Sequence, residues 1–321
     1  MKYKEWLIEW LNNYEKMHLK ARTYRNYEGA VNNHILPSLG EYELEELSFA
    51  ILQGFVNERE ANGIGKYGAG LSSGSVAIII NVLQKSLDIA VKMGIIDFHN
   101  ASKLKRTKND YIESECFSID EQRAIENEVI TKLPNKKIGI LISLYTGLRI
   151  GELMALRWED IDFINNIINI KHTAREVYIN GKRSVVLDSP KTVSSKRTIP
   201  IPIQLIPYLL ITKNASDSEY VISTKGRDTS IRSYQKIYAT MIKKLNIRYR
   251  SFHTLRHTFA TRALECGMDI KTLSEIMGHK SPMITLNRYS HSLTEHKIAM
   301  MNKLGTNLDR ELIIDKLKFE R

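Results

Sequence analysis

Apolar side chains in the first 95 residues recur at intervals of three and four, the spacing that places them on one face of a helix. The opening segment shows this most clearly, at Tyr3, Trp6, Leu7, Trp10, Leu11 and Tyr14. The same spacing predicts three further helices. One starts near Thr23, one is capped by Ser48, and one runs from about Ser75 to Met93 with Gly94 as its C-terminal cap.

The helix that starts near Thr23, the second of the chain, is expected to end before residues 36–40, LPSLG, because Pro and Gly stop helices. Glycines at 63, 65, 68 and 70 predict a loop ahead of the fourth helix. Four helices within residues 1–99 indicate a small all-α domain.

Helical periodicity is lost in residues 100–115, where positive charge gathers instead. We interpret this stretch as a linker between domains. Lys103, Lys105, Arg106 and Lys108 are its candidate contacts with a nucleic-acid backbone. The competing interpretation is a solvated run of charge, which is the commoner case.

Residues 116–295 predict a second domain with both helices and strands. Ser118 and Glu121 form a capping-box pattern at the start of one helix, and another helix covers about residues 135–145 and stops at Gly147. Strands are expected at residues 167–170, 177–179 and 185–187, with a hairpin turn at 180–181, NG. Residues 199–202 are expected to lead back to helix, and helices dominate from Ser230 onward. The predicted fold class is mainly α with a small β-sheet.

The net charge of the chain limits the kinds of partner that it is expected to bind. The chain carries a net charge of +11, which favours nucleic acid first and an anionic membrane second. We expect no membrane-spanning segment, no secretory leader, and no disulfide framework or zinc site from two cysteines. The expected location is the cytoplasm.

Metal-free cleavage of a phosphodiester needs fixed positive charge for the phosphate oxygens, a nucleophile, and a proton donor for the leaving oxygen. Arg149 follows a glycine turn at a predicted helix start, with Glu152 one turn further on to orient it. Taken alone, such an Arg–Glu pair is more often a solvent-exposed ion pair with no function. Lys191 lies on a predicted turn, and lysine is a proton donor whose pKa shifts readily.

His253 and Arg256 stand three apart on a predicted helix, so that one phosphate can contact both. His253 and His257 also have the spacing of a zinc-binding helix, but the glutamate of that motif is missing. His279 at a helix end and Tyr289 beyond it complete the candidate set, although most tyrosines and helix-terminal histidines have structural roles.

The order and spacing of these residues resemble the tyrosine recombinases, the phage-integrase family that includes Xer proteins and conjugative-transposon integrases. The matching segments are TGLRIGE at 146–152, PKT at 190–192, HTLRHTFAT at 253–261, LSEIMGH at 273–279 and NRY at 287–289. The resemblance covers roughly residues 1–295 and implies that residues 1–99 are a helical core-binding domain, followed by an α+β catalytic domain.

The resemblance also implies roles. Tyr289 would attack the phosphorus and form a 3′-phosphotyrosine, and Arg149 and Arg256 would hold the phosphate. Lys191 would protonate the leaving oxygen, His253 would assist proton transfer, and His279 would bind the phosphate. Glu152 would contact these residues rather than the DNA. No metal, ATP or other cofactor is expected.

As partners, the resemblance implies double-stranded DNA with specific recombination sites, and accessory DNA-bending or directionality proteins as candidates. Residues 296–321 have an apolar face and are expected to dock onto a neighbouring protomer in a homotetramer on two DNA sites, unless they pack on their own domain. An extra N-terminal domain for arm-type DNA sites is not expected, because the first helix begins almost at Met1, unless the chain is truncated.

The expected function is site-specific recombination in a mobile-element, phage or chromosome-resolution setting, in the nucleoid. The alternatives are a type IB topoisomerase, a catalytically silent DNA-binding module and a metal-dependent nuclease.

Overall fold

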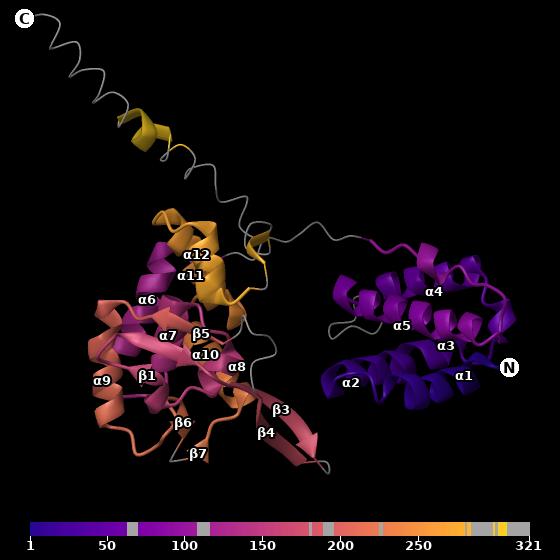
Figure 1. The fold of residues 1–321 in the computed structure, drawn as a ribbon, viewed down its shortest axis with the longest axis horizontal. Helices are drawn as coiled ribbons and strands as arrows, with labels where there is room; N and C mark the ends of the chain where they lie inside the picture. The colour runs from indigo at the N-terminus through magenta and orange to yellow at the C-terminus, as the bar shows by residue number, and fades with distance from the viewer. Residues whose placement is uncertain are drawn as a thin grey trace, which may run out of the picture. The chain divides into compact units, whose positions relative to one another are not determined.

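The computed structural model describes residues 1–62, 70–107, 116–179, 182–188, 196–224, 227–279, 281–283, 298 and 301–306. The chain forms two compact units, the helical unit Met1–Glu113 and the C-terminal unit Ser114–Arg321, each described here by itself (Figure 1).

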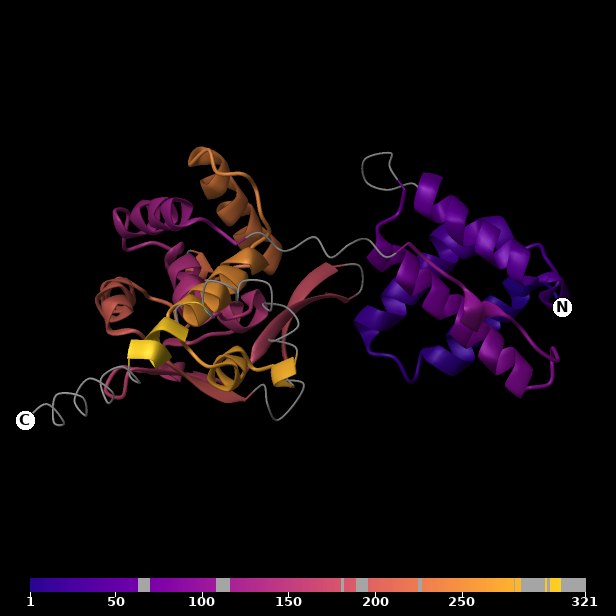
Figure 2. The same ribbon diagram turned by 90° about the horizontal axis from the view of Figure 1, so that it is seen from above.

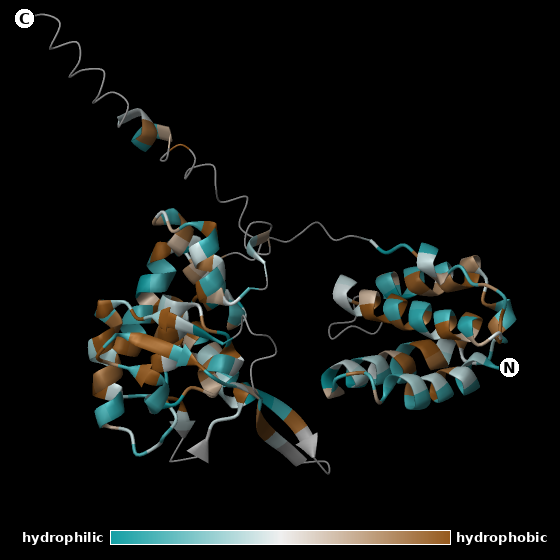
Figure 3. Cartoon of the chain, viewed as in Figure 1, coloured by the Kyte–Doolittle hydropathy of each residue, from teal (hydrophilic) through white to brown (hydrophobic). Residues whose placement is uncertain are grey.

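In the part of the helical unit that the structure describes there are five α-helices, with π-helical and 3-10 turns between them. They are α1 (Tyr3–Glu9), α2 (Ala21–Ala30), α3 (Leu36–Leu39), α4 (Phe49–Asn62) and α5 (Ser73–Lys92), with π-helical segments at Trp10–Glu15 and Val31–Ile35. The apolar stripe predicted along residues 3–14 is confirmed, since Tyr3, Trp6, Leu7 and Trp10 are fully buried. Figure 3 shows apolar and polar residues alternating along these helices, as expected when one face of each helix packs inward.

The prediction that the second helix ends before residues 36–40 is wrong. Helical turns continue from α2 through Val31–Ile35 into α3, and Pro37 lies in the first turn of α3. A proline is tolerated there because the amide it lacks has no partner within the new helix. The helical run ends instead at Gly40, whose carbonyl accepts from the backbone N–H of Lys4 at 3.0 Å.

The expectation that no segment is long and apolar enough to span a membrane is also wrong, by length and composition, for the 20-residue helix α5. Its apolar face lies in the core of the helical unit, where Val76, Ile79, Leu83 and Leu87 are buried. A central helix of a folded domain passes the same test, so α5 is weak evidence for a membrane span.

The first part of the expected linker packs on the helical unit. Ala101 is fully buried in the 3-10 turn Ala101–Lys103. The backbone N–H of Lys105 donates to Gln53 at 2.9 Å, the Arg106 guanidinium donates to Ser73, and the Thr107 hydroxyl donates to Glu60 at 2.9 Å. Residues 101–107 therefore continue the helical unit, with the side chains of Lys103, Lys105 and Arg106 exposed to solvent.

Across its described residues the C-terminal unit combines helices with three small antiparallel sheets. The helices are α6 (Ile119–Ile130), α7 (Ile138–Thr146), α8 (Ile150–Met154), α9 (Ile206–Asn214), α10 (Ile231–Lys244), α11 (His253–Glu265) and α12 (Ile270–Met277). Strands β1 (Ile161–Asp162), β2 (Ile167–Ile170) and β5 (Arg197–Pro200) form one sheet in the order β1-β2-β5, β3 (Thr173–Ile179) pairs with β4 (Lys182–Asp188), and β6 (Ser223–Thr224) pairs with β7 (Arg227–Asp228). The predicted class, mainly α with a small sheet, is confirmed.

Local signals in this unit are mostly confirmed. Ser118 and Glu121 form the predicted capping box at the start of α6. The hairpin β3–β4 is present, with Ile179 opposite Lys182, and it projects from the body of the unit in Figures 1 and 2. Its predicted NG turn lies outside the described residues. Residues 199–200 belong to β5 rather than to a lead into helix, and Pro200 is accommodated because β5 is an edge strand.

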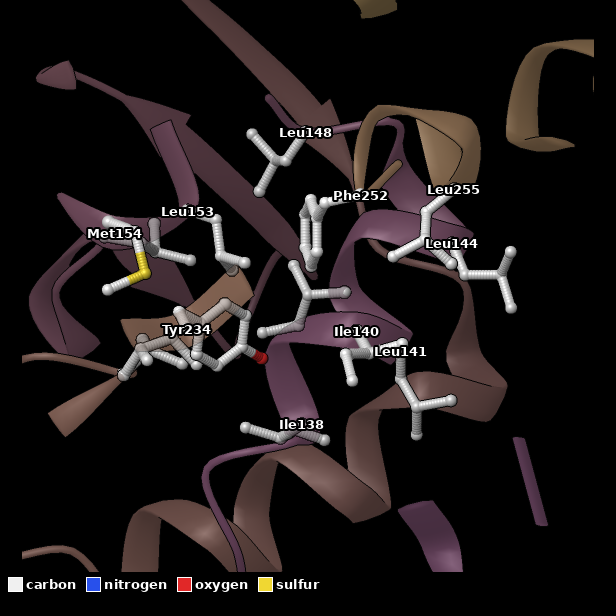
Figure 4. Close-up of a cluster of buried hydrophobic side chains, with 14 of the residues drawn as sticks. Ile138, Ile140, Leu141, Leu144, Leu148, Leu153, Met154, Tyr234, Phe252 and Leu255 are labelled. Carbon is white, nitrogen blue, oxygen red and sulfur yellow. The ribbon is translucent and has the colours of Figure 1, made fainter. Parts of the chain in front are cut away.

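Helix α7 lies at the centre of the core of this unit (Figure 4). Leu144, Leu148, Phe252 and Leu255 belong to one buried cluster, which joins α7 and the turn after it to α11. Gly139 lets α10 and its neighbours approach α7, because a Cβ there would lie 2.6 Å from Tyr234 Oη and 2.9 Å from Leu153 Cδ2.

We predict that Gly139→Ala lowers the free energy of unfolding of the C-terminal unit by about 1–3 kcal/mol, because the added methyl overpacks the core. Gly54→Ala is the matched control. It also lies within a helix, α4, but its Cβ would meet no atom within 4 Å, so helix propensity should raise the stability of the helical unit by up to about 1 kcal/mol. Calorimetric unfolding of both variants measures this, and an unchanged transition in Gly139→Ala would contradict the packing.

Candidate active site

Three arginines from separate parts of the chain meet at the C-terminal end of α12. Arg197 Nε donates to the carbonyl of Ile276 at 2.6 Å, an Arg256 nitrogen to that of Met277 at 2.6 Å, and an Arg149 nitrogen to that of Gly278 at 3.0 Å. The last carbonyls of a helix have no partner within it and carry the negative end of the helix dipole, so they attract cations. The end of α12 thus gathers three guanidinium groups.

Arg149 is the N-cap residue of α8 and lies two residues after Gly147, the glycine that ends α7, as the sequence predicts. Its guanidinium donates to Glu152 Oε1 at 2.8 Å, and its backbone N–H donates to Glu152 Oε2 at 3.0 Å. The side chain is still 36% exposed. Because a guanidinium has five N–H donors, Arg149 keeps donors for a ligand beyond its bonds to Glu152 and Gly278.

Arg256 is buried, with 2% of its surface exposed, on α11. It donates to the carbonyl of Gly147 at 2.7 Å and contacts His279 Nε2 at 3.0 Å. An arginine can only donate, so Nε2 of His279 accepts and its Nδ1 carries the proton in this arrangement. Arg256 therefore connects three segments of the site: the turn after α7, helix α11, and the end of α12 with His279.

Glu152 and Arg197 form a buried ion pair behind Arg149, each with 6% of its side chain exposed. Arg197 donates to both carboxylate oxygens, at 3.0 and 2.9 Å. Burial alone would raise the pKa of Glu152, but the hydrogen bonds and charge of Arg197, with the charge and backbone N–H of Arg149, lower that pKa to about 2. The carboxylate is therefore charged at neutral pH.

Two left-handed glycines allow this close approach. Gly147 has φ +67°, and a Cβ there would lie 2.5 Å from Phe259 Cδ1 on α11. Gly278 has φ +61°, and a Cβ there would lie 2.9 Å from an Arg197 nitrogen. A side chain at either position would be strained and would push the arginine-bearing elements apart.

His253 and His257 lie on one face of α11, with ring centroids 4.7 Å apart in an edge-to-face contact. His253 is exposed at the start of the helix, whereas His257 is buried. Among the described residues no group of three or more His, Cys, Asp or Glu side chains forms a candidate metal site.

The structure thus brings together five predicted residues. Arg149 contacts Glu152, Arg256 contacts His279, and both arginines donate to carbonyls at the end of α12. His253 lies one helical turn before Arg256 on α11. Tyr289, Lys191 and Lys108 lie outside the described residues. Sequence reasoning missed Arg197. Its one sequence signal is a charged residue at the start of the apolar stretch RTIPI, where burial demands a partner.

Comparison with known proteins identifies the family of the chain. Residues 119–296 match the model of the phage integrase family, and residues 2–59 match that of the phage integrase N-terminal SAM-like domain. A XerC-like tyrosine recombinase from Caldanaerobacter subterraneus subsp. tengcongensis is 30% identical, over 92% of this chain and 81% of the relative. The transposase of transposon Tn916 from Enterococcus faecalis is also 30% identical, over 54% of this chain and 47% of that protein.

Solved structures share the fold. The integrase of transposon Tn1549, in complex with transposon right end DNA, has a TM-score of 0.77 at 22% identity and covers 95% of this chain and 100% of that one. A lambda integrase dimer bound to a core site has a TM-score of 0.67 at 18% identity, covering 88% and 97%.

The chain belongs to the phage integrase family, the tyrosine recombinases. It is a site-specific DNA recombinase, an enzyme of DNA integration and recombination.

We predict that Glu152→Gln destabilises the C-terminal unit by about 3 kcal/mol at pH 7, because the ion pair that lowers the pKa of Glu152 to about 2 stabilises the folded state by roughly that amount. The folded-state pKa is depressed, so this stability is present above pH 5 and is lost as the pH falls toward 2. The difference in unfolding free energy between wild type and variant should shrink over that range, while Glu159→Gln, at a side chain 70% exposed, should change little. A gap that stays constant from pH 7 to pH 3 would contradict the ion-pair assignment.

Proposed function

We propose that Tyr289 cleaves DNA by attacking the scissile phosphorus. This attack forms a 3′-phosphotyrosine and releases a free 5′ hydroxyl, which is religated to a new partner strand. The observation that carries the proposal is the convergence of Arg149, Arg256 and His279 on one end of α12. Tyr289 follows His279 by ten residues, so the chain leaving this cluster leads to the nucleophile.

The two arginines stabilise the transition state. Charge spreads over the non-bridging oxygens as the phosphorus is attacked, and preorganised guanidinium groups offer permanent charge and directed N–H donors. Arg256 is held rigidly by the carbonyls of Gly147 and Met277, and Arg149 by Glu152 and Gly278. Rigid placement means that little reorganisation accompanies the reaction.

The remaining roles concern protons and the phosphate. Lys191 protonates the leaving 5′ oxygen, His253 assists transfer of the tyrosine proton, and His279 donates to a phosphate oxygen. The exposed position of His253 at the start of α11 supports a role at the DNA-facing surface. Because the bond energy is kept in the phosphotyrosine, neither ATP nor a metal ion is needed.

Double-stranded DNA with specific recombination sites is the proposed substrate. The net charge of +11 supports binding to phosphates, and the exposed Lys103, Lys105 and Arg106, together with Lys108, are proposed to contact the backbone. Neighbours of the same fold were solved as complexes with transposon DNA and as a lambda integrase tetramer on a Holliday junction. We extend this to a homotetramer on two sites, with residues 296–321 docking between protomers.

The recombinase assignment is favoured over a type IB topoisomerase because the relatives named above are recombinases and transposases. We place the activity in the bacterial cytoplasm, at the nucleoid, where such DNA sites reside.

Tyr289→Phe should bind DNA as the wild type does but form no covalent adduct, because it lacks the attacking hydroxyl. The recombination site is first identified by sequencing DNA that is trapped on the wild-type chain. The measurement is then an SDS-resistant protein–DNA band on a nicked substrate that contains this site. Tyr249→Phe, at a tyrosine 61% exposed on the same unit, is the control and should form the adduct normally. An adduct persisting in Tyr289→Phe would remove this residue as nucleophile.

A further inference from the structure

We propose that Arg197 is a positioning residue that balances the charge of Glu152, so that the charge of Arg149 remains available to the scissile phosphate. This inference rests on the phosphate-binding role proposed above for Arg149, and none of the sequence motifs assigns a role to Arg197. Arg197 does not need to touch DNA, because its side chain is only 6% exposed, behind Arg149.

Arg149 and Arg197 share the carboxylate of Glu152. Oε1 of Glu152 accepts from both Arg149 and Arg197, at 2.8 and 3.0 Å. Oε2 accepts from Arg197 at 2.9 Å and from the backbone N–H of Arg149 at 3.0 Å. Arg197 therefore occupies a site on each oxygen. Without it, the Arg149 guanidinium would be free to pair with the whole carboxylate, in a bidentate geometry that arginine and carboxylate favour.

Arg197 also sets the net charge of the site. With Arg197 present, three guanidinium groups and one carboxylate leave two net positive charges at the end of α12. Removing Arg197 leaves one, and Arg149 and Glu152 become a neutral pair. Because a phosphate in a water-poor site responds to the net field of its surroundings, losing one charge weakens transition-state stabilisation even if Arg149 keeps its place.

Arg197 also fixes the position of the C-terminal end of α12. Its Nε holds the carbonyl of Ile276 at 2.6 Å, one residue before the carbonyl that Arg256 holds. Arg197 is the first residue of β5, and β5 is paired along its length with β2, Ile170 lying opposite Arg197. The sheet thus sets the position of the end of α12, from which the chain continues to His279.

The test is the rate of covalent adduct formation on a nicked site-bearing duplex, with DNA affinity measured in parallel. Arg197→Gln should slow adduct formation by about 10²-fold, comparable to losing one transition-state donor, while the Kd for DNA changes less than about threefold. Arg197→Lys, which restores the charge without the forked pairing, should recover at least about tenfold of that loss. Arg157→Gln, at a partly exposed arginine elsewhere in the unit, is the control and should leave the rate unchanged.

A double variant separates the charge role from a merely structural one. Glu152→Gln combined with Arg197→Gln removes both charges and returns the cluster to two net positive charges, so it should form adduct at least about fivefold faster than Arg197→Gln alone. A double variant as slow as, or slower than, the single one would overturn the proposal, as would a wild-type rate in Arg197→Gln.

If Arg197→Gln does not fold, as judged by its thermal unfolding, the decision passes to Arg197→Lys. Its adduct rate should then lie about tenfold below wild type at unchanged DNA affinity, and a wild-type rate would overturn the proposal. Failure of the wild-type chain itself to form an adduct would instead contradict the proposed function, and so the two failures are distinguishable.

Discussion

In the C-terminal unit, three positively charged guanidinium groups must be held close together. Guanidinium groups from residues 149, 197 and 256 repel one another, and the energy of such repulsion grows as the surroundings lose water. The fold offsets this with two sources of negative charge: the three consecutive carbonyls that end α12, and the carboxylate of Glu152. What remains is a net positive site whose members are fixed in place before any ligand arrives.

The scaffold around this cluster explains how distant segments reach it. Helices α7 and α11 pack together through Leu144, Leu148 and Leu255, and Leu148 and Leu255 each immediately precede a site arginine. Gly147 allows close approach of the two elements, and its carbonyl then accepts from Arg256. Burial of each leucine therefore aims the neighbouring arginine. The membership of the chain in the phage integrase family fits the role proposed for this cluster, in which fixed positive charge on a rigid scaffold would stabilise a phosphate.

Local sequence signals predicted much of this. The apolar stripe of residues 3–14, the capping box at Ser118 and the stop at Gly147 depend on interactions within a few residues, and the structure has all three. The end of the second helix was mispredicted, because the tolerance for Pro37 depends on a new helix starting around it. The core helix α5 resembles a membrane span when only its own composition is considered.

For the site, residue types and spacing pointed to Arg149, Glu152, Arg256 and His279, which the structure places in two contacting pairs, Arg149–Glu152 and Arg256–His279, at the end of α12. Arg197 could not be predicted in the same way. Its partners Glu152 and Ile276 are 45 and 79 residues away, and only the tertiary fold brings the three together.

The central claim is that Arg149 and Arg256 act on a single phosphate. The most direct measurement is an experimental structure of the Tyr289→Phe variant bound to its DNA site. Our account predicts that both guanidinium groups lie about 3 Å from non-bridging oxygens of the scissile phosphate, with Glu152 still held by Arg197. Contacts from the two arginines to different phosphates, or an Arg149 that stays paired with Glu152 and Gly278 alone, would contradict it.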